Sequence, residues 1–203
     1  MSYNINEIEH IQDFFPKYIQ KEISLICQDQ NFRFAPNIST PNIKFFIDWY
    51  IKISQYKKIE DTHAFTSLVE EDSKHYKKLA SYLQSAIKKK FNLPIKKIDR
   101  IMFVMIPPNP IYKENHELPP HVDVNDQEGN IKNLLYYIND NDAPTVFYNQ
   151  KVNNIYDTDL NNLNIVHKVF PKKGSATLWD GSIVHGGSVS KTYLRKTLNV
   201  LFY

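Results

Sequence analysis

All five glycines of this chain lie after residue 128, at Gly129, Gly174, Gly181, Gly186 and Gly187. Glycine is the residue that tight turns and β-bulges most often require, because it adopts backbone conformations that other residues avoid. The first part of the chain therefore lacks the turn chemistry of consecutive hairpins, whereas the last part has it. This asymmetry predicts that the two parts differ in structural class.

The first part carries apolar residues at helical spacing. We expect one helix over residues 16–27 and a second that begins at Thr40-Pro41, where an N-cap is followed by a first-turn proline. A third helix is expected over residues 76–87, with Ser67 and Glu70 upstream at the spacing of a capping box.

After Ile98 the pattern changes to short apolar or alternating runs, which Pro, Gly, Asn and Asp separate. These runs are "RIMFVMI", "IKNLLYYIN", "TVFY", "LNIVHKVF", "GSATLW" and "TLNVLFY". Many short strands without intervening helices predict a sandwich or small barrel, one face of which the preceding helices would cover. The segment 28–39 is expected to be a loop or an irregular strand. The fold class is therefore expected to be α+β.

The length of 203 residues and the mass of 23.9 kDa fit one folding unit better than two. Within this unit we expect residues 1–97 to form a helical buttress and residues 98–203 to form the functional core. The content of 42% apolar and 23% charged residues is ordinary for a soluble globular protein.

The charge and cysteine content narrow the class of protein further. A net charge of +3 is only a weak basic excess. We therefore expect the lysine residues to lie at solvated helix ends and not to form a nucleic-acid-binding surface. Cys27 is the single cysteine, so an internal disulfide is excluded, and its position predicts a buried residue in a reducing compartment. The amino terminus carries Glu7, Glu9 and Asp13 where a signal peptide would be apolar, and no run approaches membrane-spanning length. We expect a cytoplasmic protein.

The stretch "LPPHVDVNDQ" places His121 and Asp123 two residues apart. A chain with this composition should contain about half of one H-x-D pattern by chance, so the pair needs support from the rest of the chain. On a strand end, residues i and i+2 point to the same face, which lets both side chains reach one metal ion. His185 is the candidate third ligand, and two histidines with one carboxylate form the ligand set of non-haem Fe(II) oxygenases.

Arg195 follows His185 by ten residues and opens the alternating run "RKTLNVLFY". This alternation places Arg195, Thr197 and Asn199 on one face of a strand and the apolar residues on the other. A guanidinium that points into a protein interior needs an anion there, because an unpaired buried charge is very costly. The sequence therefore predicts an anion-binding residue near the candidate metal ligands.

Taken together, these residues resemble the Fe(II)- and 2-oxoglutarate-dependent dioxygenases, and among them the prolyl-hydroxylase-like branch. The resemblance covers roughly residues 98–203 and consists of "HVD", the strand "LLYYIND", the strand "PKKGSATLWD", and a histidine followed ten residues later by an arginine. It implies a double-stranded β-helix, a jelly-roll barrel with helices packed on one sheet.

The resemblance also implies the roles of individual residues. His121, Asp123 and His185 would bind Fe(II), Arg195 would pair with the distal carboxylate of 2-oxoglutarate, and Tyr137 would hydrogen-bond to the same carboxylate. Asn199 shares the inward face of the Arg195 strand and is a further candidate for cosubstrate binding. Turnover of 2-oxoglutarate and O2 to succinate and CO2 would hydroxylate a C–H bond of the substrate. A prolyl residue of a peptide is the first expectation for this substrate, and a free amino acid or other small molecule is the second.

The chain departs from the family pattern at three places. It has Ala143-Pro144 where relatives often have a glycine pair, Met105 or Ile106 where relatives have a polar aromatic residue, and Leu201 at a position that is often aromatic. Two other classes of protein stay open on this sequence. One is a cupin-like metal protein without O2 chemistry, and the other is a jelly-roll interaction module without a metal.

The remaining histidines and the residues at the end of the "LWD" strand are expected to have structural roles. His167 is expected in the core or at the surface, as are His10, His63, His75 and His116. Trp179 and Asp180 are expected to end a strand. Substrate selection is expected from the loops over residues 107–120 and 150–162, because loops carry specificity on such scaffolds.

Overall fold

The computed structural model describes residues 7–35, 64–111, 116–123, 130–154 and 157–203. Two α-helices in this part of the chain are α1 (Lys17–Gln28) and α3 (Lys74–Phe91), and a short 3-10 helix, η3, covers Leu160–Asn162. The strands are β1 (Glu9–Ile11), β2 (Arg33–Ala35), β3 (Ala64–Leu68), β4 (Ile98–Ile106), β5 (His116–Glu117), β6 (Lys132–Tyr137), β7 (Thr145–Lys151), β8 (Ile165–Val169), β9 (Ala176–Asp180), β10 (Ile183–Gly186), β11 (Ser188–Val189) and β12 (Arg195–Phe202).

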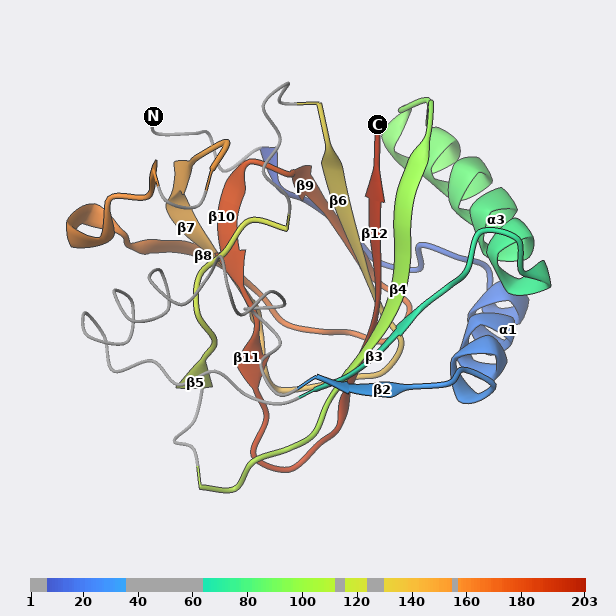
Figure 1. Cartoon of the computed structure of the whole chain (residues 1–203), viewed down its shortest axis with the longest axis horizontal. Coiled ribbons are helices and arrows are strands. Elements are labelled where there is room, and N and C mark those ends of the chain that lie inside the picture. Colours follow the sequence, from blue (N-terminus) through green and yellow to red (C-terminus); the bar gives the residue numbers. More distant parts are fainter. Residues whose placement is uncertain (1–6, 36–63, 112–115, 124–129, 155–156) are drawn as a thin grey trace.

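The strands form three antiparallel groups. The largest has the order β1-β9-β6-β12-β4-β3-β2, and the smaller ones have the orders β10-β7-β8 and β11-β5. Figure 1 shows the smaller groups on one side of the molecule and the large sheet in the middle, with the helices beyond it. The expected α+β jelly roll is thereby confirmed.

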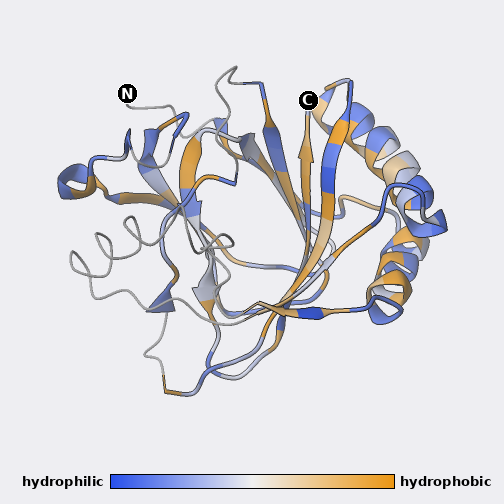
Figure 2. Cartoon of the chain, viewed as in Figure 1, coloured by the Kyte–Doolittle hydropathy of each residue, from blue (hydrophilic) through white to orange (hydrophobic). Residues whose placement is uncertain are grey.

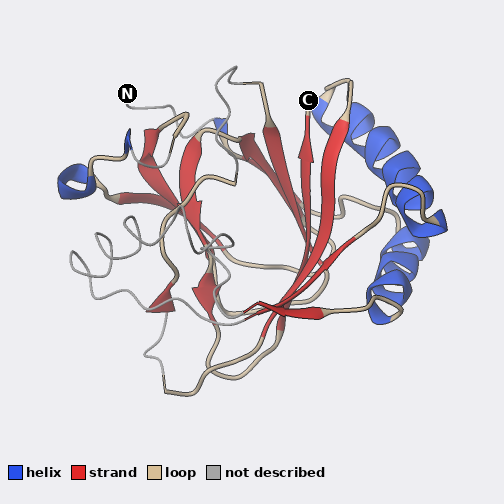
Figure 3. Cartoon of the chain, viewed as in Figure 1, coloured by secondary structure: helices blue, strands red, loops and turns tan. Residues whose placement is uncertain are grey.

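Both helices pack on the outer face of the large sheet (Figure 3). Their buried residues share one hydrophobic core with the outward residues of the strands, including Leu198, Val200 and Phe202 of β12. On α1 these residues are Ile19, Ile23, Ile26 and Cys27, and on α3 they are Leu79, Leu83, Ala86 and Ile87. Both helices carry hydrophobic and hydrophilic bands, as expected for helices with one buried face (Figure 2).

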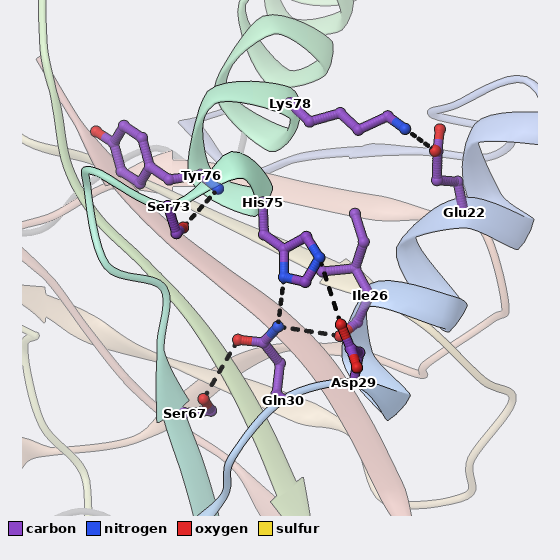
Figure 4. A network of polar contacts seen from close by, with 9 residues as sticks. All are labelled: Glu22, Ile26, Asp29, Gln30, Ser67, Ser73, His75, Tyr76 and Lys78. Carbon is purple, nitrogen blue, oxygen red and sulfur yellow. Dashed lines mark hydrogen bonds and ion pairs between the residues drawn. The ribbon is translucent and has the colours of Figure 1, made fainter.

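The start of α3 differs from the expected capping box. Ser67 lies in β3 and pairs with Phe103 of β4, so it cannot cap a helix. Ser73 is the N-cap, and its hydroxyl accepts a hydrogen bond from the Tyr76 N–H at 3.0 Å (Figure 4). The helix ends at Asn92, which adopts the left-handed conformation that closes many helices.

Polar contacts tie the two helices together at their exposed edges. Glu22 of α1 accepts hydrogen bonds from Lys78 and from Tyr82 of α3. At the carboxyl end of α1, the Gln30 amide donates to the Ile26 carbonyl at 3.1 Å and contacts His75 at 3.2 Å (Figure 4). These contacts hold the helices as one layer against the sheet.

The first part of the chain also supplies strands that the glycine distribution did not predict. β1 pairs with β9, and β3 pairs with β4, which extends the large sheet on both sides. Such strands join the sheet through pairing with partners distant in sequence, and they need no tight hairpin turn. The expected irregular strand within residues 28–39 is β2, and the helix expected from Thr40-Pro41 lies outside the described residues. The division at residues 97 and 98 stays a prediction.

In the described part of the chain, every helix is too short or too polar to cross a lipid bilayer.

Candidate metal and anion site

His121 and His185 are backbone neighbours although 64 positions separate them in the sequence. The N–H of His121 donates to the His185 carbonyl at 2.8 Å, and the N–H of His185 donates to the His121 carbonyl at 2.9 Å. Their rings lie 4.6 Å apart between centroids. Asp123 follows two residues later, and the ligand atoms of the three side chains lie within 4.8 Å of one another. The three predicted metal ligands therefore converge on one point.

Each histidine presents the same ring nitrogen to this point. Nδ1 of His121 lies 3.0 Å from the Pro119 carbonyl oxygen, and Nδ1 of His185 lies 3.0 Å from that of Ile183. A proton on Nδ1 would donate to these carbonyls and leave Nε2 free to ligate, which is the usual arrangement of metal-binding histidines. Burial, reinforced by the nearby His185, lowers the pKa of His121 to about 4, so its ring is neutral at physiological pH.

Asp123 is held at both carboxylate oxygens. Arg100 of β4 donates from Nη2 to Oδ1 at 3.0 Å, and Asn133 of β6 donates from Nδ2 to Oδ2 at 2.7 Å. Oδ2 also lies 3.5 Å from Nε2 of His185. Burial raises the pKa of Asp123, but the contact with His185 and the charge of Arg100 outweigh it, so the pKa lies well below its usual range. Asp123 is therefore an ionised, oriented ligand.

Arg195 begins β12 and is buried, with 5% of its surface exposed. Its Nη2 donates to the hydroxyl of Thr145 at 2.8 Å, and that hydroxyl lies 2.9 Å from the hydroxyl of Tyr137. Among the described residues, no carboxylate lies within ion-pair distance of Arg195, and its Nε has no hydrogen-bond partner. Burial lowers the pKa of Arg195. A buried guanidinium in this state is a site for an anionic ligand.

One cavity of about 90 Å³ joins the two features, since His121, Asp123, His185, Arg195 and Asn199 all line it. Thr145 lines it as well. The glycines that follow His185 keep this space open. A Cβ on Gly187 would lie 3.5 Å from Nη1 of Arg195, and a Cβ on Gly186 would lie 3.1 Å from the Leu118 carbonyl oxygen.

All predicted site residues except Tyr137 line one cavity. The metal candidates come together, Arg195 lines the same cavity, and Asn199 lines it with a side-chain oxygen that has no partner in the described part of the chain. Tyr137 is buried behind Arg195, and the guanidinium carbon lies 6.0 Å from its ring centre. Trp179 and Asp180 end β9, and the Trp179 ring packs 4.9 Å from that of His185. The roles of these residues stay predictions.

Three residues that support the site, Thr145, Arg100 and Asn133, were not predicted from the sequence. Thr145 is the first residue of the strand that begins with "TVFY", and nothing local in the sequence ties it to Arg195. Arg100 is one of three arginines, but it begins an apolar run and nothing local ties it to Asp123. Asn133 is a fully buried amide within a strand, which is a detectable feature because such groups require partners.

The side chains present fit a divalent first-row metal ion and an organic anion. Two neutral imidazoles and one carboxylate leave coordination positions open on the opposite side of a metal. Arg195 Nε and Asn199 Oδ1 are buried polar atoms to which no described residue offers a hydrogen bond, and a ligand in this cavity would satisfy them.

No family model and no curated protein matches this chain. Solved structures do resemble it. An oxidoreductase of the 2OG-Fe(II) oxygenase family from Burkholderia pseudomallei has a TM-score of 0.65 at 9% identity, over 98% of this chain and 85% of that one. A prolyl hydroxylase from Trichoplax adhaerens, in complex with a hypoxia inducible factor peptide fragment, has a TM-score of 0.60 at 15% identity, over 98% and 84%.

A prolyl-4-hydroxylase from Pseudomonas putida has a TM-score of 0.58 at 13% identity, over 97% of this chain and 91% of that one. All three alignments span the helices as well as the strands, because they cover nearly all of this chain. At such low identities the likeness concerns the fold. This chain has the fold of 2-oxoglutarate-dependent oxygenases, including prolyl hydroxylases.

Proposed function

We propose that this protein is an Fe(II)- and 2-oxoglutarate-dependent dioxygenase that hydroxylates a C–H bond of its substrate. The observation that carries the proposal is that the cluster of His121, Asp123 and His185 shares one cavity with Arg195, a buried cation for which no described residue supplies a carboxylate. A cupin-like metal site would account for the cluster, but it gives no reason for the unpaired guanidinium.

His121 and His185 would hold the metal through Nε2, and Asp123 through its carboxylate. When bound, Fe(II) with 2-oxoglutarate and O2 supplies the oxidising chemistry, and succinate and CO2 are released. Arg195 would position the distal carboxylate of 2-oxoglutarate by a charge-assisted hydrogen bond. Thr145 would orient the guanidinium, and Tyr137 would in turn orient Thr145.

For the substrate we propose a prolyl residue of a peptide or protein, with a free amino acid or other small molecule as the alternative. The likeness to two prolyl hydroxylases supports the first choice. The departures at Ala143-Pro144 and at Ile106, which lines the cavity, support keeping the second. We also propose a cytoplasmic location, because Cys27 is a free buried thiol, and we propose neither a membrane nor a nucleic-acid partner.

The test is reconstitution of the purified protein under argon with Fe(II) and 2-oxoglutarate, followed by exposure to O2. We expect stoichiometric metal, saturable binding of 2-oxoglutarate and formation of succinate, which a proline-containing peptide should stimulate. His185→Ala should lose all three, whereas His167→Ala, on β8, should retain them. A wild-type protein that binds no divalent metal would contradict the proposal. A peptide panel without any gain of one oxygen would contradict the prolyl substrate alone.

A further inference from the structure

Arg100 lies on the cavity side of β4, at the end of the strand farthest from Arg195. Alternation along β4 places Arg100 on the same face as Met102, Val104 and Ile106, all of which line the cavity. The register pairs Arg195 with Ile106 at the other end of the strand. Arg100 is thus the next inward residue beyond the cavity wall, on the side of the metal candidates.

Arg100 belongs to a row of paired residues that crosses three neighbouring strands of the sheet. Leu201 of β12 pairs with Arg100 on one side and with Asn133 of β6 on the other, and Asn133 pairs with Trp179 of β9. Figure 1 shows these four strands side by side. Leu201 lies between Arg100 and Asn133, which both reach Asp123.

Arg100 makes one ion pair among the described residues, and its partner is Asp123 at 3.0 Å. The Arg100 side chain is 24% exposed and that of Asp123 is 11% exposed, so Arg100 is the more accessible partner of the pair. A guanidinium keeps its charge at every physiological pH and has five N–H donors. The contact with Asp123 uses Nη2 of Arg100 and leaves other N–H groups able to donate.

This inference rests on the proposed function. If that function holds, no negative charge of the loaded site is left to neutralise the charge of Arg100. A divalent cation would share the single negative charge of Asp123, and Arg195 would face the cosubstrate dianion. The metal, Asp123, Arg195 and 2-oxoglutarate together have no net formal charge, so Arg100 adds one positive charge to the site. Such a surplus near a partly desolvated cavity favours an anionic ligand.

Unused hydrogen-bonding groups occur in the same row of residues. Nε of Arg100 and Nε1 of Trp179 are buried donors without an acceptor in the described part of the chain. Trp179 is 2% exposed and its side chain is among those that line the cavity. Two free donors suit a ligand that brings acceptor oxygens.

We propose that Arg100 binds a carboxylate of the primary substrate, and that this protein therefore acts on a small carboxylic acid such as a free amino acid. The contact with Asp123 would set the distance between that carboxylate and the metal. Within the two substrates considered above, the proposal favours the small molecule over an internal peptide segment, which has no carboxylate at its reacting residue.

Arg100 could instead only orient Asp123, without binding the substrate. A variant of Asn133 distinguishes these two roles. Asn133 holds the other oxygen of Asp123 without a charge. If Arg100 only orients Asp123, Asn133→Ala and Arg100→Gln should have the same consequences. If Arg100 binds the substrate, only Arg100→Gln should change the preference for an acid over its amide.

The experiment measures binding without turnover, on protein loaded with Mn(II) and 2-oxoglutarate under argon. Calorimetric titrations would compare L-amino acids, hydroxy acids and aliphatic acids with their matched amides, leaving out Asp and Glu, whose amides keep a carboxylate. At least one acid should bind about 10-fold or more tightly than its amide, as expected for one charge-assisted hydrogen bond. Arg100→Gln should abolish this preference, and Arg100→Lys should keep part of it.

Asn133→Ala should lower metal affinity and leave the preference intact. Lys97→Gln removes a nearby exposed charge that pairs with Asp99 and should change neither. The proposal is overturned if no acid binds more tightly than its amide, or if the preference persists in Arg100→Gln. Failure of the wild-type protein to bind 2-oxoglutarate would instead overturn the proposed function itself.

Discussion

His121 and His185 donate backbone hydrogen bonds to each other's carbonyl oxygens, at 2.8 and 2.9 Å. This mutual bridge joins the segment after β5 to β10 and fixes the separation of the two imidazoles through the backbone. Two of the three candidate ligands are thus positioned without a metal, and Asp123 is positioned separately by Arg100 and Asn133.

Metal binding should stabilise the fold measurably. A ligand that binds only the native state at about 100 times its Kd contributes about 2.7 kcal/mol to the free energy of unfolding. We expect Mn(II) to raise the Tm of the wild-type protein and EDTA to reverse the effect, as followed by circular dichroism. Asp123→Ala should show no rise, whereas Asp99→Ala, which removes an exposed carboxylate of β4, should behave like the wild type. Equal rises in both variants would place the metal elsewhere.

Arg195→Met should weaken 2-oxoglutarate binding at least about 30-fold, because truncating one partner of a buried charge pair costs roughly 2–5 kcal/mol. Metal affinity should stay nearly unchanged, since Arg195 does not contact the metal candidates. Arg195→Lys should give an intermediate affinity, because the ammonium keeps the charge but loses the planar fork. Anaerobic titration of 2-oxoglutarate into each metal-loaded protein measures this. An unchanged affinity in Arg195→Met would assign the cosubstrate anchor to another residue.

Thr145→Val should remove the acceptor of the Arg195 guanidinium and the nearer of two hydroxyl partners of Tyr137 together. Leaving buried polar groups unsatisfied costs about 1–3 kcal/mol, so both stability and 2-oxoglutarate affinity should fall. Thr145→Ser keeps the hydroxyl and should restore most of the affinity. Urea denaturation and ligand titration on the same samples check the two effects. If Thr145→Val binds 2-oxoglutarate normally, Thr145 has no role in orienting Arg195.

Asp180 should contribute to stability in a pH-dependent way. Burial raises its pKa, but hydrogen bonds from Ser182 and Lys132 outweigh this, and the net pKa is lowered. Because the folded-state pKa lies below the unfolded value of about 3.8, the stabilisation is present above that pH and is lost as the pH falls through the folded-state pKa.

Asp180→Asn should therefore destabilise the protein at pH 7 by about 1.5–3 kcal/mol, the range for hydrogen bonds to a charged group. The difference from the wild type should shrink as the pH falls below about 4. Urea denaturation across this pH range is the measurement. Asp99→Asn, in a more exposed ion pair with Lys97, should cost much less. If the difference in unfolding free energy between wild type and variant does not change with pH, the charge of Asp180 is not its cause.

Local patterns in the sequence determined the residues of α1, most strands of the large sheet and the inward face of β12. These features depend on neighbours one to four positions away, so helical and strand periodicity is enough to find them. The same period placed Arg195 and Asn199 on the cavity side. The spacing of His121, Asp123, His185 and Arg195, with the family resemblance, selected the candidate site.

Only the tertiary structure decided which residues support that site. Arg100 meets Asp123 across 23 positions, and Arg195 meets Thr145 across 50, through strands whose pairing no local pattern specifies. β1 and β3 likewise became strands through pairing with β9 and β4, and Ser67 was taken into β3 rather than capping a helix. Strand pairing and buried polar contacts gain free energy only when distant segments meet, so their outcome is a property of the whole fold.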